Sequence, residues 1–263
     1  MSESRPAAVA GRFYPDDATE LAAVVDEFVA TASLDSAAGP APKAIIAPHA
    51  GYPYSGPIAG SAYACVQAAA VQRVVMFAPA HRWPVLGLAL PASTAFETPL
   101  GTVPVDTDAA QRASQFDFVD TIDAAHVEEH AIEVQLPFLQ RRLGHVFRLV
   151  PFVVGWATTD QVEAVMEELW GGAETLIVIS SDLSHLHDYD TARRLDDDTS
   201  AAIENLSPQS LQARGACGHV SIQALLSVAA RCGLTARTMD LRNSGDTAGE
   251  RSEVVGYGAY VIG

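Results

Sequence analysis

Short apolar runs alternate with segments of helical period along most of the chain, and this alternation limits the fold more than any other feature. Seven runs rich in apolar and β-branched residues lie at 44–48, 74–79, 86–91, 147–154, 175–181, 234–241 and 254–262. Five segments repeat apolar residues every three to four positions, at 16–33, 129–143, 158–172, 190–206 and 217–233. Strands that alternate with helices are typical of an α/β protein. We therefore predict a three-layer sandwich, with helices on both faces of a mixed central sheet.

The length of 263 residues suits one sizeable core. We find no internal repeat and no long low-complexity linker, so we predict a single domain over residues 1–263. The best candidate loop is 33–43, between the first helical segment and the first central strand. Pro137 lies inside the segment 129–143 and predicts a kink or a break there.

The charge balance excludes two classes of partner. The chain carries 32 acidic and 16 basic residues, for a net charge of −16. Nucleic acid and anionic membranes both attract basic faces, so neither is expected as a main partner. No apolar run approaches the length of a membrane span, and the N-terminus lacks the features of a signal peptide. We expect a cytoplasmic protein.

Three of the eight histidines stand just after predicted strands. His49 follows AIIAP, His81 follows VVMFAP, and His185 follows TLIVISSDLS. Ligands of α/β proteins bind at the carboxyl ends of strands, so these positions are candidates for a site. Asp182 precedes His185 by three residues, and its carboxylate could orient the imidazole or raise its pKa. A lone loop histidine is usually a surface residue, but three at corresponding positions favour a common role.

Cys217 opens the last helical segment and adds a sulfur ligand to the candidates. A thiol at a helix N-terminus feels the positive end of the dipole, so we expect its pKa to fall. A thiolate is a good ligand for a transition metal and a good nucleophile. The alternative is a small buried apolar residue, which is the usual role of a free cysteine.

His130 begins another helical segment, three residues before Glu133. Glu128 and Glu129 would complement the helix dipole there, so part of this pattern is helix capping. An inward-facing His130 would instead support a metal ligand or contact a polar substrate. The two interpretations are equally consistent with the sequence.

The familiar catalytic motifs are missing from the sequence: GxGxxG after a strand, GxxxxGK[ST], GxSxG, HExxH and paired CxxC. The remaining constellation is His49, His81 and Cys217, with Asp182 and His185 near by. Two histidines and one anionic ligand suit a divalent transition metal with open coordination positions, such as Fe(II), Cu or Zn.

Motifs spread in order along the chain resemble those of the Memo family (mediator of cell motility). They are AGRFYP (10–15), APHAGYPYSG (47–56), FAPAHR (77–82), ETPLGTVPVD (97–106), EHAIEVQLPFLQ (129–140), VISSDLSH (178–185), CGHVSI (217–222) and VVGYGAYVI (254–262). Together they span nearly the whole chain, which makes the resemblance specific.

The resemblance implies a fold like that of the class III extradiol ring-cleaving dioxygenases. His49, His81 and Cys217 would be the metal ligands, with the cysteine where those enzymes carry a glutamate. His185 would match their general base, with Asp182 beside it. The metal implied is most readily Fe(II), with Cu or Zn as alternatives.

The resemblance also implies a cleft mouth lined by Phe13, Tyr52 and Tyr54. Prokaryotic members tend to be associated with a radical-SAM partner protein, and animal members have been regarded as phosphotyrosine-peptide binders and as metal-dependent redox proteins. Phe13 replaces the tryptophan of animal members, so their peptide binding is not carried over. Ala80 and Ser221 replace Ser and Pro of many members, and His219 adds an imidazole near the site.

Two functions follow as hypotheses. The first is a non-haem metal-dependent oxidoreductase, with His185 moving a proton between substrate and oxygen. The thiolate at the third ligand position makes ring cleavage itself a weaker expectation than the fold suggests. The second is a non-catalytic protein that binds a peptide, small molecule or partner protein in the same cleft.

Overall fold

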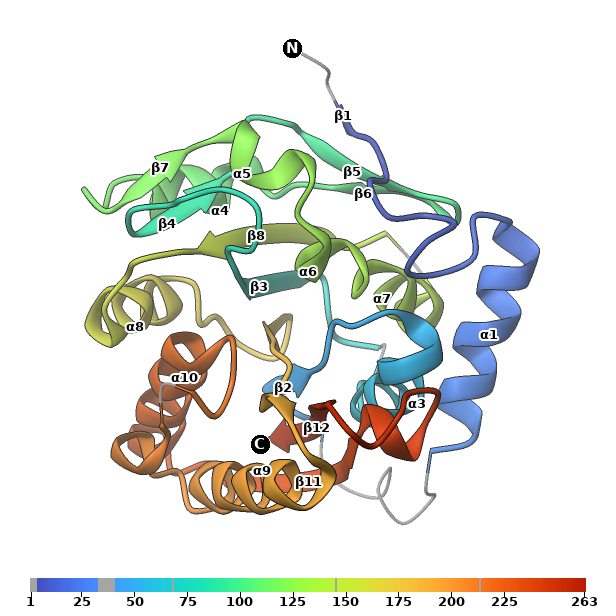
Figure 1. Ribbon diagram of the computed structural model, residues 1–263. Coiled ribbons are helices and arrows are strands. Elements are labelled where there is room, and N and C mark those ends of the chain that lie inside the picture. Colours follow the sequence, from blue (N-terminus) through green and yellow to red (C-terminus); the bar gives the residue numbers. More distant parts are fainter. Residues whose placement is uncertain (1–3, 33–40, 68, 145, 213) are drawn as a thin grey trace.

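The computed structural model describes residues 4–32, 41–67, 69–144, 146–212 and 214–263 (Figure 1). The helices are α1 (Ala18–Ala30), α3 (Tyr52–Ala64), α4 (Thr107–Ala113), α5 (Asp123–Val127), α6 (His130–Glu133), α7 (Leu136–Leu143), α8 (Thr159–Glu168), α9 (Tyr189–Glu204) and α10 (His219–Arg231). The strands are β1 (Ser4–Arg5), β2 (Ala44–Ala47), β3 (Arg73–Pro79), β4 (Leu88–Leu90), β5 (Ala95–Thr98), β6 (Gly101–Pro104), β7 (Val119–Thr121), β8 (Arg148–Val154), β9 (Thr175–Ser180), β10 (His185–His187), β11 (Ala236–Asn243) and β12 (Val254–Ile262).

A large mixed sheet forms the centre of the molecule. Within the described residues it has nine strands, in the order β10-β12-β2-β9-β3-β8-β4-β7, with β11 paired to β12. The four central strands β2, β9, β3 and β8 run parallel to one another. On either side of them, β12 pairs with β2 and β4 pairs with β8 in antiparallel orientation. The carboxyl ends of β2, β9 and β3 therefore lie side by side at one edge.

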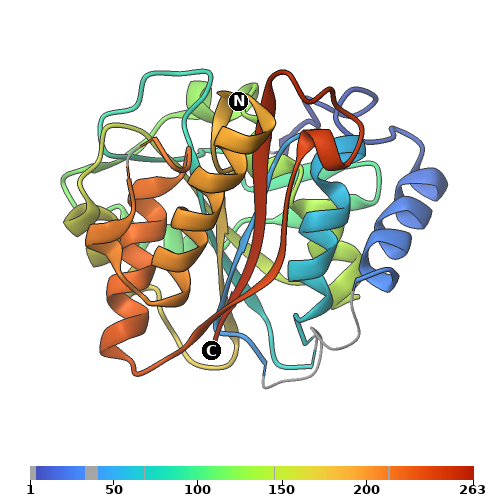
Figure 2. The same ribbon diagram turned by 60° about the horizontal axis from the view of Figure 1, so that its bottom comes forward.

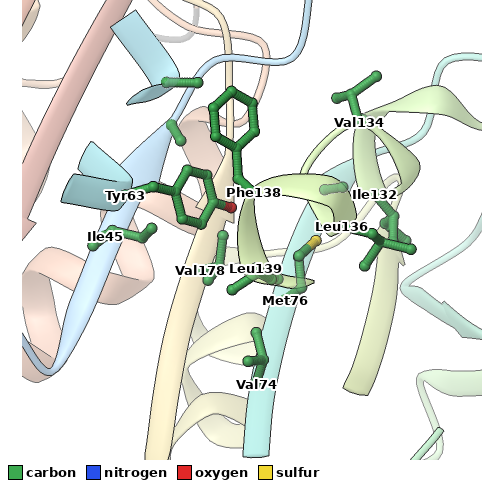
Figure 3. Close-up of a cluster of buried hydrophobic side chains, with 14 of the residues drawn as sticks. Ile45, Tyr63, Val74, Met76, Ile132, Val134, Leu136, Phe138, Leu139 and Val178 are labelled. Carbon is green, nitrogen blue, oxygen red and sulfur yellow. The ribbon is translucent and has the colours of Figure 1, made fainter. Parts of the chain in front are cut away.

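Helices pack against this sheet from two sides. In Figure 2, α9 and α10 lie on one side of the strands, and α1 and α3 lie on the other. The strands alternate accordingly, because successive side chains point to opposite faces. In β3, Val74 and Met76 belong to one buried cluster, while Val75 and Phe77 belong to a second. Figure 3 shows the first cluster, where the side chains of α6 and α7 meet those of β3 and β9.

All seven predicted strands are present, as β2, β3, β4, β8, β9, β11 and β12, and the five predicted helical segments are helical. The segment 129–143 divides into α6 and α7, with Pro137 in the first turn of α7. That break confirms the prediction from Pro137, because proline is tolerated where the backbone N–H has no helical acceptor. Of the predicted loop 33–43, residues 33–40 lie outside the described part of the chain.

Helix α3 was not predicted, because its sequence YPYSGPIAGSAYA is rich in glycine and proline and suggests a turn. Two glycines explain its packing. A Cβ on Gly56 would lie 2.3 Å from the Phe28 ring, and one on Gly60 would lie 2.5 Å from the Phe28 carbonyl oxygen. α1 therefore packs closely on α3, and tertiary contact outweighs weak helix propensity. No described helix is long and apolar enough to cross a membrane.

Candidate metal centre

His49 lies at the carboxyl end of β2, in the layer where three parallel strands end. Its side chain is 2% exposed, and its backbone N–H donates to Oδ1 of Asp182, just past the end of β9 (2.7 Å). Burial lowers the pKa of His49 to about 4, and nearby carboxylates and imidazoles add smaller effects of both signs. The imidazole is therefore neutral at pH 7, which is the form that binds metals.

The hydrogen bonds around Ser180 decide which nitrogen of His49 carries the proton. The Ser180 hydroxyl donates to the carbonyl of Ala131 (2.6 Å) and accepts from Nε2 of Gln135 (2.9 Å). The Gln135 amide orientation is fixed, because the same Nε2 also donates to the carbonyl of Pro48 (2.9 Å). The hydroxyl can therefore only accept from Nδ1 of His49, 2.9 Å away. Nδ1 bears the hydrogen, and Nε2 carries the lone pair, with Sγ of Cys217 3.4 Å away.

Glu129 holds the two other histidines at their Nδ1 edges. Its carboxylate is 1% exposed and accepts from the backbone N–H of His81 (2.7 Å) and from Nδ1 of His81 (2.9 Å). Nδ1 of His130 lies 3.2 Å from the same oxygen, outside hydrogen-bond geometry. Burial alone would raise the pKa of Glu129, but the imidazoles of His130 and His81 hold it well below its usual range. Glu129 is thus a carboxylate that contacts two rings at once.

The three imidazoles meet in one cluster. Their ring centroids are 5.1 Å apart for His49 and His81, 5.5 Å for His49 and His130, and 4.8 Å for His81 and His130. One nitrogen from each ring can be chosen so that all three lie within 4.8 Å of one another. Imidazole nitrogens gathered within this distance suit a transition metal. The three imidazole donors, with Nδ1 of His49 and of His81 each hydrogen-bonded, therefore fit a divalent ion.

Cys217 lies at the margin of this cluster. Its Sγ is 3.4 Å from Nε2 of His49 and accepts the backbone N–H of Asp182 (3.2 Å). The expected fall in its pKa is wrong for the metal-free protein, since burial and the Asp182 carboxylate raise the pKa to about 12. Burial outweighs the helix end here, and Cys217 also precedes Gly218, the N-cap of α10, which begins at His219. A metal would have to displace the thiol proton to bind the sulfur.

Asp182 and His185 are placed differently from each other. Asp182 is buried, and its Oδ2 lies 4.0 Å from Nε2 of His49. His185 begins the edge strand β10, is exposed, and pairs with Val255 of β12. The next residue, Leu186, has a φ of 60°. The segment that carries His185 is thus a short strand, and the general-base role of His185 stays a prediction.

The three aromatic residues predicted for the mouth of the cleft occupy distinct surroundings. The Phe13 ring packs on the His130 ring at 4.8 Å, so Phe13 contacts the cluster. Tyr52 is buried and donates its hydroxyl to the Val134 carbonyl (2.8 Å). Tyr54 is exposed in the first turn of α3. Phe13 is thus next to the candidate metal site, while Tyr52 packs in the core.

His130 lies at the start of a helix and also beside the other two histidines, while its predicted role at the site stays a prediction. It is the first residue of α6, with Glu129 as the N-cap, and its ring joins the cluster. Sequence reasoning missed Glu129, Gln135 and Ser180 as residues that hold the rings. The sequence indicates these roles only weakly. A carboxylate before a helix usually caps the helix, and a serine at a strand end usually belongs to a turn.

The chain is similar to proteins of one family over nearly its full length. Residues 5–261 match the family described as Memo-like protein. A MEMO1 family protein of Aquifex aeolicus is 34% identical over 267 residues, covering 96% of this chain and 97% of that protein. Another, of Methanosarcina acetivorans, is 35% identical over 275 residues and covers 99% of each.

This chain belongs to the Memo-like family. A MEMO1 family protein of Ignicoccus hospitalis is 35% identical over 278 residues and covers 97% of each chain. The predicted family is therefore confirmed. None of these names states a substrate or a reaction.

Proposed function

We propose that this Memo-like protein binds one divalent transition metal ion at His49, His81 and His130 and uses it for redox chemistry on a small substrate. One observation carries the proposal. The Nδ1 edges of the rings face Ser180 or Glu129, and nitrogens of all three rings lie within 4.8 Å of one another. Histidines arranged in this way by hydrogen-bonded neighbours are typical of metal ligands.

The charges around the cluster support a divalent cation. Glu129 and Asp182 are both buried beside the rings, and a cation bound there would interact favourably with both carboxylates. An ion of charge +2 would balance them. Imidazole ligands with a thiol near by suit Fe(II), Cu and Zn, and we place Fe(II) first because the fold resembles that of the extradiol dioxygenases.

Cys217 remains a candidate ligand in this proposal, as the sequence predicted. Its sulfur lies beside Nε2 of His49, so it could join the same ion after losing its proton. His130 and Cys217 thus compete for the third ligand position, or both bind. Variants of the two residues separate these cases.

The chain's own residues supply the remaining chemistry. A bound ion would contribute Lewis acidity and, if it is iron or copper, electron transfer. The Ser180 hydroxyl keeps the proton of His49 on Nδ1, and Asp182 holds a negative charge 4.0 Å from Nε2 of that ring. We retain His185 as the proposed general base, which would carry a proton between substrate and solvent from its exposed position on β10.

Metal content of the purified protein tests this proposal. After anaerobic loading with Fe(II) and removal of free metal, the wild type should retain about one ion per chain. His49→Ala and His81→Ala should lose it, whereas His185→Ala, at an exposed position, should retain it. A wild type that retains no ion with Fe(II), Cu(II) or Zn(II) would overturn the proposal and favour the alternative of a metal-independent binding protein.

The third ligand follows from two further variants. If His130 is the ligand, His130→Ala should lower metal affinity far more than Cys217→Ser. The reverse order would assign the position to Cys217. Equal losses would place both side chains on the ion.

A further inference from the structure

A pocket of about 240 Å³ opens beside the candidate metal centre. Its walls come from the segments that follow β3 and β8, and they include Trp83, Pro84, Val85, Val154 and Trp156. Cys217 also lines it. Because the Cys217 sulfur is 3.4 Å from Nε2 of His49, anything held in this pocket lies next to the histidine cluster.

The two tryptophans at the pocket are unusually exposed. Trp156 is 73% exposed and Trp83 is 47% exposed, although large apolar side chains normally lie inside a protein. Exposed aromatic side chains that line one pocket commonly mark a ligand or partner site. Trp170, the third tryptophan of the chain, instead lies over the Lys43 ammonium, with 5.1 Å to the ring centroid.

The backbone fixes the segment that carries Trp156. Its N–H donates to the Val85 carbonyl (2.9 Å), and its own carbonyl accepts from Gly87 (3.1 Å). The segments cross so closely at Gly155 that a Cβ there would lie 2.1 Å from the Val85 oxygen. The backbone of this wall is therefore ordered without a ligand, which lowers the entropy cost of binding.

The lining also selects by charge. Within the described residues, the side chains that line the pocket include no carboxylate, ammonium or guanidinium group. A charged ligand group would lose its hydration there without gaining a partner. The net charge of −16 further disfavours anions.

We propose that this pocket binds an uncharged aromatic ring of a small-molecule substrate, between Trp83 and Trp156 and against Cys217. A cavity of roughly 150 Å³ can hold benzene, so the space suits one ring with small substituents. Indole rings favour aromatic partners through stacked or edge-to-face contacts. The ring's role as a substrate rests on the proposed metal function, but its binding does not require the metal.

Ligand titrations with phenol, cyclohexanol and benzoate test the proposal. We would follow them by NMR on the metal-free protein and on the Fe(II)-loaded protein under anaerobic conditions. Phenol should bind both forms, at least tenfold more tightly than benzoate and more tightly than cyclohexanol. Trp156→Ala and Trp83→Ala should each weaken phenol binding at least tenfold, whereas Trp170→Phe should leave it unchanged.

Circular dichroism of each variant checks that it is folded, and Trp156→Leu replaces Trp156→Ala if the latter is not. Phenol binding that is unaffected in both tryptophan variants, or benzoate that binds as tightly as phenol, would overturn the proposal. So would wild-type self-association that Trp156→Ala abolishes without any phenol binding, since it would assign the face to a second copy. Failure of metal binding with intact phenol binding would overturn the metal centre alone.

Discussion

Two buried glutamates, four residues apart at the ends of α6, differ in what they contact. Glu133 is 0% exposed, pairs with the Arg5 guanidinium, and accepts the Tyr14 hydroxyl (2.5 Å) and the backbone N–H of Val9 (3.0 Å). Glu129 is 1% exposed and faces the imidazoles of His81 and His130.

The difference separates a network that stabilises the fold from one that contacts the proposed metal ligands. Arginine is always charged, so Glu133 has its neutralising cation in every state of the protein. The partners of Glu129 are imidazoles, which can stay neutral and turn their other nitrogens to a metal. The Glu133 network therefore fixes the N-terminal segment. The imidazoles beside Glu129 remain able to bind a cation through their other nitrogens.

Glu133→Ala should have the largest effect on stability. It leaves the Arg5 guanidinium buried without its partner, which typically costs about 3–5 kcal/mol of unfolding free energy. Urea denaturation measures the loss, and the double variant Arg5→Met/Glu133→Gln should recover part of it. If Glu133→Ala unfolds at the wild-type urea concentration, the network does not stabilise the fold.

Asp196 differs from both glutamates, because it is a buried carboxylate that makes no ion pair in the described structure. Its Oδ1 accepts the backbone N–H of Ser184 (3.0 Å), and burial raises its pKa from 3.8 to about 6. The folded state thus binds this proton more tightly than the unfolded state. The contribution of Asp196 to the free energy of unfolding is complete below about pH 4 and is lost as the pH rises through 6.

The free energy of unfolding should fall by about 2–3 kcal/mol across this range, once the contributions of other titrating groups are subtracted. Asp196→Asn should remove it, because an amide does not titrate. The measurement is urea denaturation of both proteins from pH 4 to pH 8. A difference between the two stabilities that is independent of pH would contradict the account.

Glu129→Gln should affect metal binding more than stability, unlike Glu133→Ala. We expect metal affinity to fall about 10- to 100-fold, since residues that orient ligand histidines have effects of this size. The loss of stability should be smaller than in Glu133→Ala, because no buried arginine is left unpaired. Calorimetric titration with Zn(II) gives the affinity, and unchanged affinity would remove Glu129 from the site.

Ser180→Ala should have the smallest effect of the series. It removes the acceptor for Nδ1 of His49 and leaves Gln135 with one partner fewer. One hydrogen bond is worth about 1 kcal/mol, so metal affinity should fall several-fold. The same calorimetric titration measures it, and a loss as large as that of His49→Ala would mean that the serine does more than orient the ring.

The sequence predicted the strands and the edge at which the site lies, because buried strands and strand-end histidines leave strong local patterns. It did not predict α3, whose Gly56 and Gly60 are explained only by contact with Phe28. It also gave the wrong direction for the Cys217 pKa, since burial by distant segments outweighs a local helix end. The convergence of His130 with His49 and His81 depends on how α6 packs against β3, which no local pattern encodes.

The most direct test of the metal centre is a crystal structure of the anaerobically Fe(II)-loaded protein, with anomalous data collected at the iron edge. The account predicts one anomalous peak, at roughly 2.1 Å from ring nitrogens of His49 and His81. His130 or Cys217 should complete the coordination. A peak elsewhere, such as at exposed His185, or no peak in fully loaded crystals, would contradict it.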